Sequence, residues 1–186
     1  MNKLLHYTKI DKAYSIINSN IIRFGNIRFC NDFREAENFI GPDDGSMFIF
    51  SCSMSPLNST NWLAYAGDKY GVAIEFVFNE DAHYLDLFNN SVRGVPIKYV
   101  SDLWDYIADH INENGLVKDN FFKLENEYRF YDYISTSNDD AFIEYKLNLK
   151  CLKQINIYVH KTMLNYAATL FKEFKFVNII ANRFIR

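Results

Sequence analysis

The sequence predicts a single compact α+β domain, with short mixed or antiparallel strands and flanking helices. Short apolar runs typical of strands are scattered along the chain, and segments with helical spacing lie between some of them. The regular strand–helix–strand alternation of a doubly wound sheet is missing, which favours α+β over α/β. With 186 residues, only 3 Pro and 7 Gly, the chain is expected to form one domain over residues 1–186 without a long flexible linker.

The first half of the chain contains the clearest elements. Strict alternation of apolar residues predicts a strand over 70–78, and apolar residues at helical spacing predict a helix over 10–17. Thr8 and Asp11 have the pattern of a capping box at the start of this helix. The other elements expected here are strands over 3–8, 21–24 and 47–53, a helix over 58–66 and a turn over 41–45.

The second half is more irregular. Ser101 is placed to cap a helix whose apolar stripe runs from Leu103 to Ile111, and Gly115 is expected to end it. Residues 126–134 and 141–147 are expected to pair as strands across a polar turn at 135–140. The remaining predictions are strands over 95–100, 154–160 and 175–181 and a helix over 162–172.

Composition limits the class of protein. The three cysteines, Cys30, Cys52 and Cys151, lie far apart and form no C-x-x-C pair, so neither a disulfide framework nor a structural zinc site is expected. His83, His110 and His160 fit no metal-ligand spacing. The sequence shows no secretory signal and no apolar run of membrane-spanning length, which predicts a cytoplasmic protein without a membrane partner.

Charge is distributed unevenly along the chain. Residues 1–140 carry 12 Lys+Arg against 21 Asp+Glu, a net charge of −9, whereas residues 141–186 carry 8 against 2, a net charge of +6. The basic C-terminal quarter is either a surface for a polyanion or a solvated surface that balances the acidic remainder.

The segment from Glu125 to Phe130 does not resemble an ordinary strand. In an extended chain Glu125 and Glu127 point to the same face, and Arg129 shares it. The flanking residues are strongly apolar, so the segment is expected to be buried, and buried carboxylates are costly unless paired or used. Two interpretations stay open: an ion-pair cluster with Arg129, or an acidic catalytic site in which two close carboxylates raise one pKa.

Five separated motifs occur in a fixed order. They are Leu5-His6-Tyr7-Thr8, Asn31-Asp32 with Glu35, Phe50-Ser51-Cys52-Ser53, Trp62-x-x-Tyr65 with Gly71 to Phe76, and Glu125-x-Glu127-Tyr128-Arg129-Phe130. Over residues 4–180 this order resembles a large bacterial family known only as a domain of unknown function. Its layout in turn resembles the ADP-ribosyltransferase superfamily, in which a first strand bears His or Arg, a second strand bears hydroxyl residues and a later strand bears a glutamate.

This resemblance implies an NAD-dependent mono-ADP-ribosyltransferase with NAD as its substrate and no metal. It also implies a toxin or anti-phage effector that modifies a macromolecule, with nucleic acid slightly preferred over protein and an antitoxin as a conceivable partner. An NAD glycohydrolase is a close variant. The alternatives are a non-catalytic module on the same fold that binds a nucleotide or a partner, and a metal-free nuclease that uses the acidic cluster.

The resemblance also implies roles for individual residues. Glu127 would stabilise positive charge on the ribose, Glu125 would orient the acceptor or act as a general base, and His6 would bond the ribose and the nicotinamide carboxamide. The other residues expected to bind NAD are Tyr7 and Thr8, Ser51 and Ser53, Arg23 or Arg28 at the pyrophosphate, and Trp62 or Tyr65 as the stacking ring.

Most of these residues also have an ordinary structural interpretation. His6 is compatible with a structural histidine, and Trp62 and Tyr65 are compatible with two core residues. Asn31-Asp32 is typical of a turn or a helix cap, and this structural assignment is preferred to a functional one for that pair. Cys52 alternates with two serines, so it is expected to face the core if they face a cleft.

Overall fold

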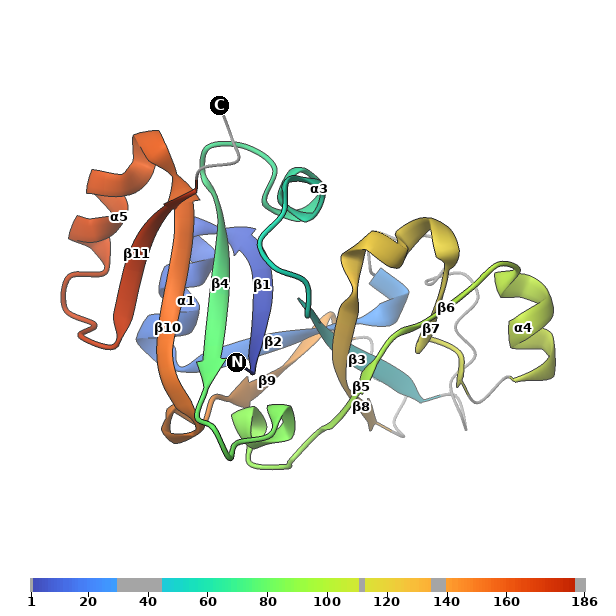
Figure 1. Cartoon of the computed structure of the whole chain (residues 1–186). Helices are drawn as coiled ribbons and strands as arrows, with labels where there is room; N and C mark the ends of the chain where they lie inside the picture. The colour runs from blue at the N-terminus through green and yellow to red at the C-terminus, as the bar shows by residue number, and fades with distance from the viewer. Residues whose placement is uncertain (1, 30–44, 111–112, 135–139, 183–186) are drawn as a thin grey trace.

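The structure is a computed structural model that describes residues 2–29, 45–110, 113–134 and 140–182. It confirms an α+β domain with a mixed sheet (Figure 1). Several predictions lie outside the described residues: those for Asn31, Asp32, Glu35 and Ile111, and those for the turns at 41–44 and 135–139.

Nine strands of the described chain form one sheet, in the order β11-β10-β4-β1-β3-β2-β9, with β8 paired to β3 and β5 paired to β8. The pair β10–β11 is parallel and the other pairs are antiparallel. The strands are β1 (Lys3–Lys9), β2 (Ile21–Asn26), β3 (Ser46–Ser53), β4 (Gly71–Phe78), β5 (Arg93–Pro96), β8 (Glu127–Ile134), β9 (Phe142–Lys146), β10 (Leu152–His160) and β11 (Val177–Asn182).

The sheet divides at β3. Strand β8 pairs along the whole of β3, ending at the pair Ser53↔Glu127. Strands β2 and β1 pair with β3 at different points: β2 at Phe48 and Ile49, and β1 at Ser53. Because β8 occupies one edge completely, β1 and β2 share the other edge and diverge from each other (Figure 1). This fork brings the start of β8, the end of β3 and the middle of β1 together.

Two helices cover one side of the sheet. Helix α1 (Ile10–Ser19) contacts β1, β2 and β4, and helix α5 (Leu164–Leu170) contacts β10 and β11. Their buried residues join a single core with the inward side chains of the strands, including Phe24 and Phe130. In β8 the period of two places Tyr128 and Phe130 in this core. It therefore directs Glu127 and Arg129 to the opposite face.

A small unit projects between β5 and β8. It contains the parallel strands β6 (Lys98–Val100) and β7 (Val117–Asp119), helix α4 (Leu103–Asp109) and the 3-10 helix η6 (Asn120–Glu125). A second short segment, α3 (Ser59–Asn61), continues into a π-helical turn, η3 (Trp62–Ala66). The other 3-10 turns are η1 (Ile27–Phe29), η4 (Tyr84–Phe88), η7 (Leu149–Cys151) and η8 (Lys161–Met163).

Both predicted helix caps are wrong. Thr8 stays in the ladder of β1 opposite Val72, and the residue before α1 is Lys9, which makes no side-chain capping bond. Helix α4 is capped by Asp102, whose carboxylate accepts a hydrogen bond from the N–H of Asp105, and not by Ser101. In both cases the cap lies one residue after the predicted position, because the preceding strand or loop extends farther.

Two strand predictions also need correction. Residues 141–147 do form a strand, but β9 pairs with β2, because β3 and β5 already occupy the two edges of β8. The predicted strand 95–100 is divided between β5 and β6 at Ile97, whose N–H bonds to the carbonyl of Glu127. There the chain leaves β8 and turns toward β7.

Substitution of Phe130 tests where the core lies. Its ring is fully buried against Phe50 of β3 and Phe88 of η4, whereas Phe121 on η6 is 82% exposed. Replacing Phe130 by Ala leaves a large cavity and is expected to cost about 3–5 kcal/mol of unfolding free energy. Phe121→Ala is expected to stay within about 0.5 kcal/mol of the wild type. Urea unfolding followed by circular dichroism measures both, and equal losses in the two variants would contradict the assignment of the core.

Candidate functional site

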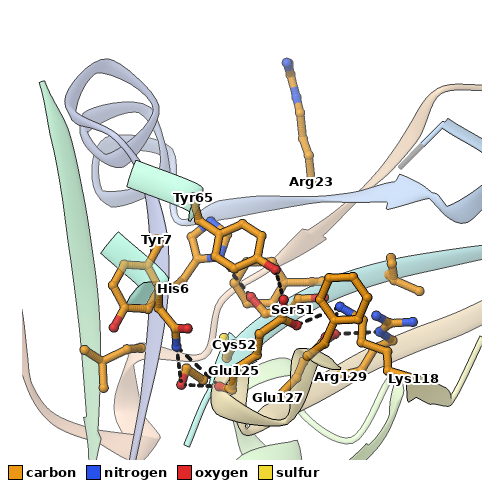
Figure 2. A pocket seen from close by; sticks show the side chains of 16 residues that line it. His6, Tyr7, Arg23, Ser51, Cys52, Tyr65, Lys118, Glu125, Glu127 and Arg129 are labelled. Atoms are coloured by element: carbon orange, nitrogen blue, oxygen red, sulfur yellow. Dashed lines mark hydrogen bonds and ion pairs between the residues drawn. The ribbon is translucent and has the colours of Figure 1, made fainter. Parts of the chain in front are cut away.

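A cavity of about 510 Å³ lies at the fork of the sheet (Figure 2). This volume is in the range of pockets that hold small molecules. Its walls come from β1, β2, β3, β7, β8, η6 and the α3–η3 segment, so segments distant in sequence meet here. The predicted site residues that line it are His6, Tyr7, Arg23, Ser51, Ser53, Tyr65, Glu125 and Glu127.

Three predicted residues do not line the cavity. Trp62 is fully buried and packs with Leu5 and Ala73 in a separate apolar cluster, so its ring is not available for stacking on a ligand. Thr8 is buried in the β1 ladder. Arg28 is exposed on the turn that follows β2.

Arg23 lies at the rim of the cavity. Its Nε donates to Glu144 Oε1 at 3.0 Å, and its guanidinium lies 4.3 Å from the centre of the Phe142 ring. Figure 2 shows this side chain pointing away from the cluster of other labelled residues. Of the two arginines expected at a pyrophosphate, only Arg23 is in a position to reach a ligand in the cavity.

The carboxylate of Glu127 is buried and heavily bonded. Its Oε1 accepts from Ser51 Oγ at 2.5 Å and from Arg129 Nε at 2.7 Å, and its Oε2 lies 2.9 Å from Lys118 Nζ. Burial alone raises the pKa of Glu127, but the charges of Arg129 and Lys118 outweigh it and lower that pKa to about 2. Glu127 is therefore ionised at neutral pH, and the increase in pKa expected for one of the two carboxylates does not fall on Glu127.

Glu125 reaches the same cavity by a different route from the predicted one. It is the last residue of η6 and not part of β8, and Asn126 between the two glutamates is left-handed, with φ 44°. The chain turns at Asn126, a residue type that tolerates this conformation. The expectation of one extended strand is wrong, yet both carboxylates converge. Glu125 Oε2 lies 2.8 Å from Lys118 Nζ, and Glu125 Oε1 accepts from Tyr65 Oη.

Tyr65 supplies both a ring and a hydroxyl. It lines the cavity from η3, and its hydroxyl is the donor to Glu125. Burial and the hydrogen bond to Glu125 raise the pKa of Tyr65, so the phenol keeps its proton. Because Trp62 is in the core, Tyr65 is the aromatic residue of the W-x-x-Y motif that is placed for contact with a ligand.

Sequence reasoning missed two residues that support the site. Lys118 on β7 lies between the two carboxylates, with its side chain 8% exposed. Asn61 is buried, and its Nδ2 donates to Ser53 Oγ, which in turn donates to the carbonyl of Glu125 at 2.7 Å. An Asn before a Trp and a Lys in a short polar strand carry no local signal, since their partners come from other elements.

His6 has a defined tautomer. Its Nδ1 lies 3.0 Å from the carbonyl oxygen of Ser51, and since a carbonyl can only accept, Nδ1 carries the proton in the neutral ring. Nε2 is then an acceptor. The ring also contacts Phe50, with the two ring centres 4.5 Å apart. Burial lowers the pKa of His6 to about 4, so the ring is neutral at physiological pH.

Cys52 is an unsuitable nucleophile. It is buried, and its side chain belongs to the main core, as the alternation with Ser51 and Ser53 predicts. Burial, with the charge of Glu127 as a smaller contribution, raises the pKa of the Cys52 thiol well above its ordinary value. A thiol that keeps its proton is a poor nucleophile.

Two further observations concern the described residues as a whole. They contain no group of three or more His, Cys, Asp or Glu side chains placed to hold a metal ion. They also contain no helix with the length and apolar character needed to cross a membrane.

Comparison with known proteins gives one structural likeness. No protein-family model matches the chain, and no curated protein matches it. The bacterial family that the five motifs resemble is therefore not identified by these comparisons. Among solved structures, DarT of Thermus sp. 2.9 in complex with ADP-ribosylated ssDNA is similar, with a TM-score of 0.42 and 13% identity, over 97% of this chain and 94% of that one.

The low pKa of His6 predicts a measurable dependence of stability on pH. An unfolded His titrates near 6.5, so between pH 6.5 and pH 4 the unfolded state binds more protons and stability falls as the pH falls. His6→Gln removes this dependence. Between pH 7.5 and pH 5, the wild type is expected to lose about 1–2 kcal/mol more than the variant. Urea unfolding at both pH values measures this, with a change at the exposed residue after α4, His110→Gln, as the control. Equal losses in wild type and His6→Gln would refute the assignment.

Proposed function

We propose that this protein is an NAD-dependent mono-ADP-ribosyltransferase of the toxin or anti-phage type. The observation that carries the proposal is the convergence of His6, Ser51, Tyr65, Glu125 and Glu127 on one cavity. These side chains come from the four motifs whose residues the structure describes, and they lie on different elements. The same residue types, in the same chain order, underlie the resemblance to the ADP-ribosyltransferase superfamily.

The polar groups of the cavity suit the groups that NAD presents. Nε2 of His6 is an acceptor, as a ribose hydroxyl or a carboxamide N–H requires. The ring of Tyr65 offers a flat wall on which a nicotinamide can stack. At the rim, Arg23 offers a guanidinium, which binds phosphate in bidentate geometry. Tyr7 and Ser53 also line the cavity. Ser53 Oγ donates to the carbonyl of Glu125, whereas the buried hydroxyl of Tyr7 has no hydrogen-bond partner among the described residues.

NAD supplies a nicotinamide–ribose bond whose cleavage leaves positive charge on the ribose. A carboxylate that is ionised before the reaction stabilises such charge without reorganisation. Glu127 meets this condition, because Arg129 and Lys118 keep its pKa low. A carboxylate accepts about four hydrogen bonds. Glu127 has three protein donors, Ser51, Arg129 and Lys118, so it retains capacity for a ribose hydroxyl.

Glu125 is the candidate for contact with the acceptor. It is less buried than Glu127 and has two described partners, Tyr65 and Lys118, which leaves more of its oxygens available. It lies on η6 at the wall of the cavity, where an incoming hydroxyl or base can approach. We assign it the role of orienting the acceptor or taking its proton.

Nucleic acid is the favoured acceptor class because of the basic C-terminal quarter. The lysines of this quarter do not line the cavity. They lie on or beside β9, β10 and α5, so an acceptor that contacts them has to extend across the sheet. A long, flexible polyanion meets this requirement better than a small molecule. An NAD glycohydrolase has the same site with water as the acceptor.

A non-catalytic nucleotide-binding module remains the second candidate, and one observation favours it. Glu127 and Arg129 form a buried, well-bonded pair of the kind that also occurs as a purely structural cluster. Such a module binds NAD or a related nucleotide without consuming it.

Turnover of NAD separates these functions. The purified protein is incubated with NAD labelled in its adenylate phosphate, together with single-stranded DNA, RNA or a protein lysate. Wild type is expected to transfer label to one acceptor class, and Glu127→Gln to lose about 10²–10³-fold of the rate, because it removes the charge that faces the reacting ribose. Glu80→Gln, which changes an exposed carboxylate on the turn after β4, outside the cavity and outside the basic quarter, is the matched control and keeps full activity.

Each outcome of this experiment has one meaning. Release of nicotinamide without transfer indicates a glycohydrolase. Binding of NAD by calorimetry without any consumption indicates the binding module. If neither consumption nor binding is detected with folded wild-type protein, the proposed function is wrong. Circular dichroism of Glu127→Gln verifies that a loss of rate is not a loss of fold.

A further inference from the structure

Lys118 occupies a central position among the charged groups of the cavity. Its Nζ lies 2.8 Å from Glu125 Oε2 and 2.9 Å from Glu127 Oε2. The side chain is 8% exposed and therefore buried. The two carboxylates bond to one nitrogen atom, so they share a single small site. Figure 2 shows Lys118 reaching this site from beside Arg129.

The two cations differ in which of the two glutamates they contact. Arg129 bonds to Glu127 through Nε, and its Nη1 is bound to the carbonyl of Gly115. Glu125 takes its other described hydrogen bond from the neutral hydroxyl of Tyr65. Lys118 is therefore the described cation that bonds to both carboxylates.

We propose that Lys118 is a positioning residue that holds Glu125 and Glu127 together as a pair of carboxylates facing the cavity. Two carboxylates in one buried site repel each other, and without a compensating cation one of them takes up a proton. A protonated Glu127 would offer less charge to a cationic ribose, and a protonated Glu125 would no longer accept a proton. The catalytic consequence rests on the proposed function, but the electrostatic role of Lys118 does not.

The small unit between β5 and β8 supplies several of the groups on which this role of Lys118 depends. Strand β7 carries Lys118, and η6, which follows directly, carries Glu125. Tyr99 on β6 accepts a hydrogen bond from the N–H of Glu127 at 2.9 Å. The unit thus delivers a cation, a carboxylate and a backbone contact to the first residue of β8.

Among the described residues, other titratable groups face the pair from the neighbouring elements, and the test has to account for them. They are Arg129 on β8, Tyr65 on η3, Tyr99 on β6, Cys52 on β3 and His6 on β1. Burial raises the pKa of Tyr99 to about 12, and the pKa values of Tyr65 and Cys52 are raised as well. These three groups keep their protons between pH 5 and pH 8, and His6 stays neutral there.

Titration of the carboxyl carbons by NMR tests the proposal directly. Protein labelled with ¹³C at the glutamate side-chain carboxyl is followed from pH 5 to pH 8, and Glu125→Gln and Glu127→Gln identify the two signals. In the wild type, the Glu127 signal is expected to stay at its carboxylate position. In Lys118→Met, the pair of carboxylates is expected to bind one proton, with a titration midpoint above about pH 5. The pKa of a carboxyl group in a buried site can rise by several units when its compensating cation is lost.

Two control variants separate contact from general charge. Lys118→Arg keeps a cation at the site and is expected to prevent the uptake of this proton. Lys123→Met removes a positive charge from an exposed position on η6, the segment that carries Glu125, and is expected to leave the titration of the pair unchanged. Signals in Lys118→Met that remain at the carboxylate position throughout the range would overturn the proposal.

A second measurement covers the case in which Lys118→Met does not fold. The double variant Lys118→Met/Glu125→Gln removes one cation and one anion together. If Lys118 acts by offsetting the second carboxylate, the double variant regains most of the stability lost by the single one. If the double variant is as unstable as Lys118→Met, Lys118 acts through packing and the proposal is wrong.

The rate of NAD consumption adds a functional readout that can fail separately. Loss of the cation is expected to move the acid limb of the pH–rate profile of Lys118→Met to higher pH, with activity recovering toward pH 8. A merely structural role would lower the rate at every pH. If the wild type consumes no NAD, the proposed function fails, while the carboxyl titration still decides the role of Lys118.

Discussion

The compensation of one buried charge determines how the small unit, β3 and β8 fit together. Glu127 is 4% exposed, and an unpaired carboxylate at this depth would cost several kcal/mol. Ser51 on β3, Arg129 on β8 and Lys118 on β7 together remove that cost. Since Lys118 comes from the unit between β5 and β8, separation of this unit from the sheet would remove one of the three partners of the Glu127 carboxylate. The same contacts that fix the architecture therefore fix the polar groups of the cavity.

Local pattern predicted the elements whose residues face one environment along their whole length. Alternation located β4, and helical spacing located α1, because each presents one apolar side to the core. Glu125 and Glu127 were correctly paired, but on the assumption of an extended chain. The structure uses a left-handed Asn126 instead, and the convergence depends on a turn that no alternation pattern encodes. Of the two cations that lower the pKa of Glu127, Arg129 shares its face of β8, as alternation predicts, whereas Lys118 comes from another strand and has no signal in the local pattern.

The contacts of Lys118 and Asn61 could not be predicted from local sequence patterns. Lys118 acts on Glu127 from a neighbouring strand, and Asn61 supports the backbone of Glu125 from 64 positions away in the chain. Such contacts depend on how β3 divides the sheet, which in turn depends on pairings between distant strands. Trp62 and Tyr65 illustrate the same limit at shorter range. Their spacing suits one helical face, yet one ring is fully buried and the other lines the cavity, since the segment forms a π-helical turn at the edge of the core.

The balance of charge in the cavity bears on which ligands it can accept. Two carboxylates, Glu125 and Glu127, face two cations, Lys118 and Arg129, so this cluster has no net charge when all four groups are ionised. For the proposed function, this balance means that these four described groups together do not repel the anionic pyrophosphate of a dinucleotide, although carboxylates lie at the centre of the site. Its orientation is then set by short-range contacts: an arginine at the rim suits phosphate, whereas the carboxylates at the centre suit a group that becomes positive. An acidic site without these cations would stabilise the same positive charge but would repel the phosphates of the molecule that carries it.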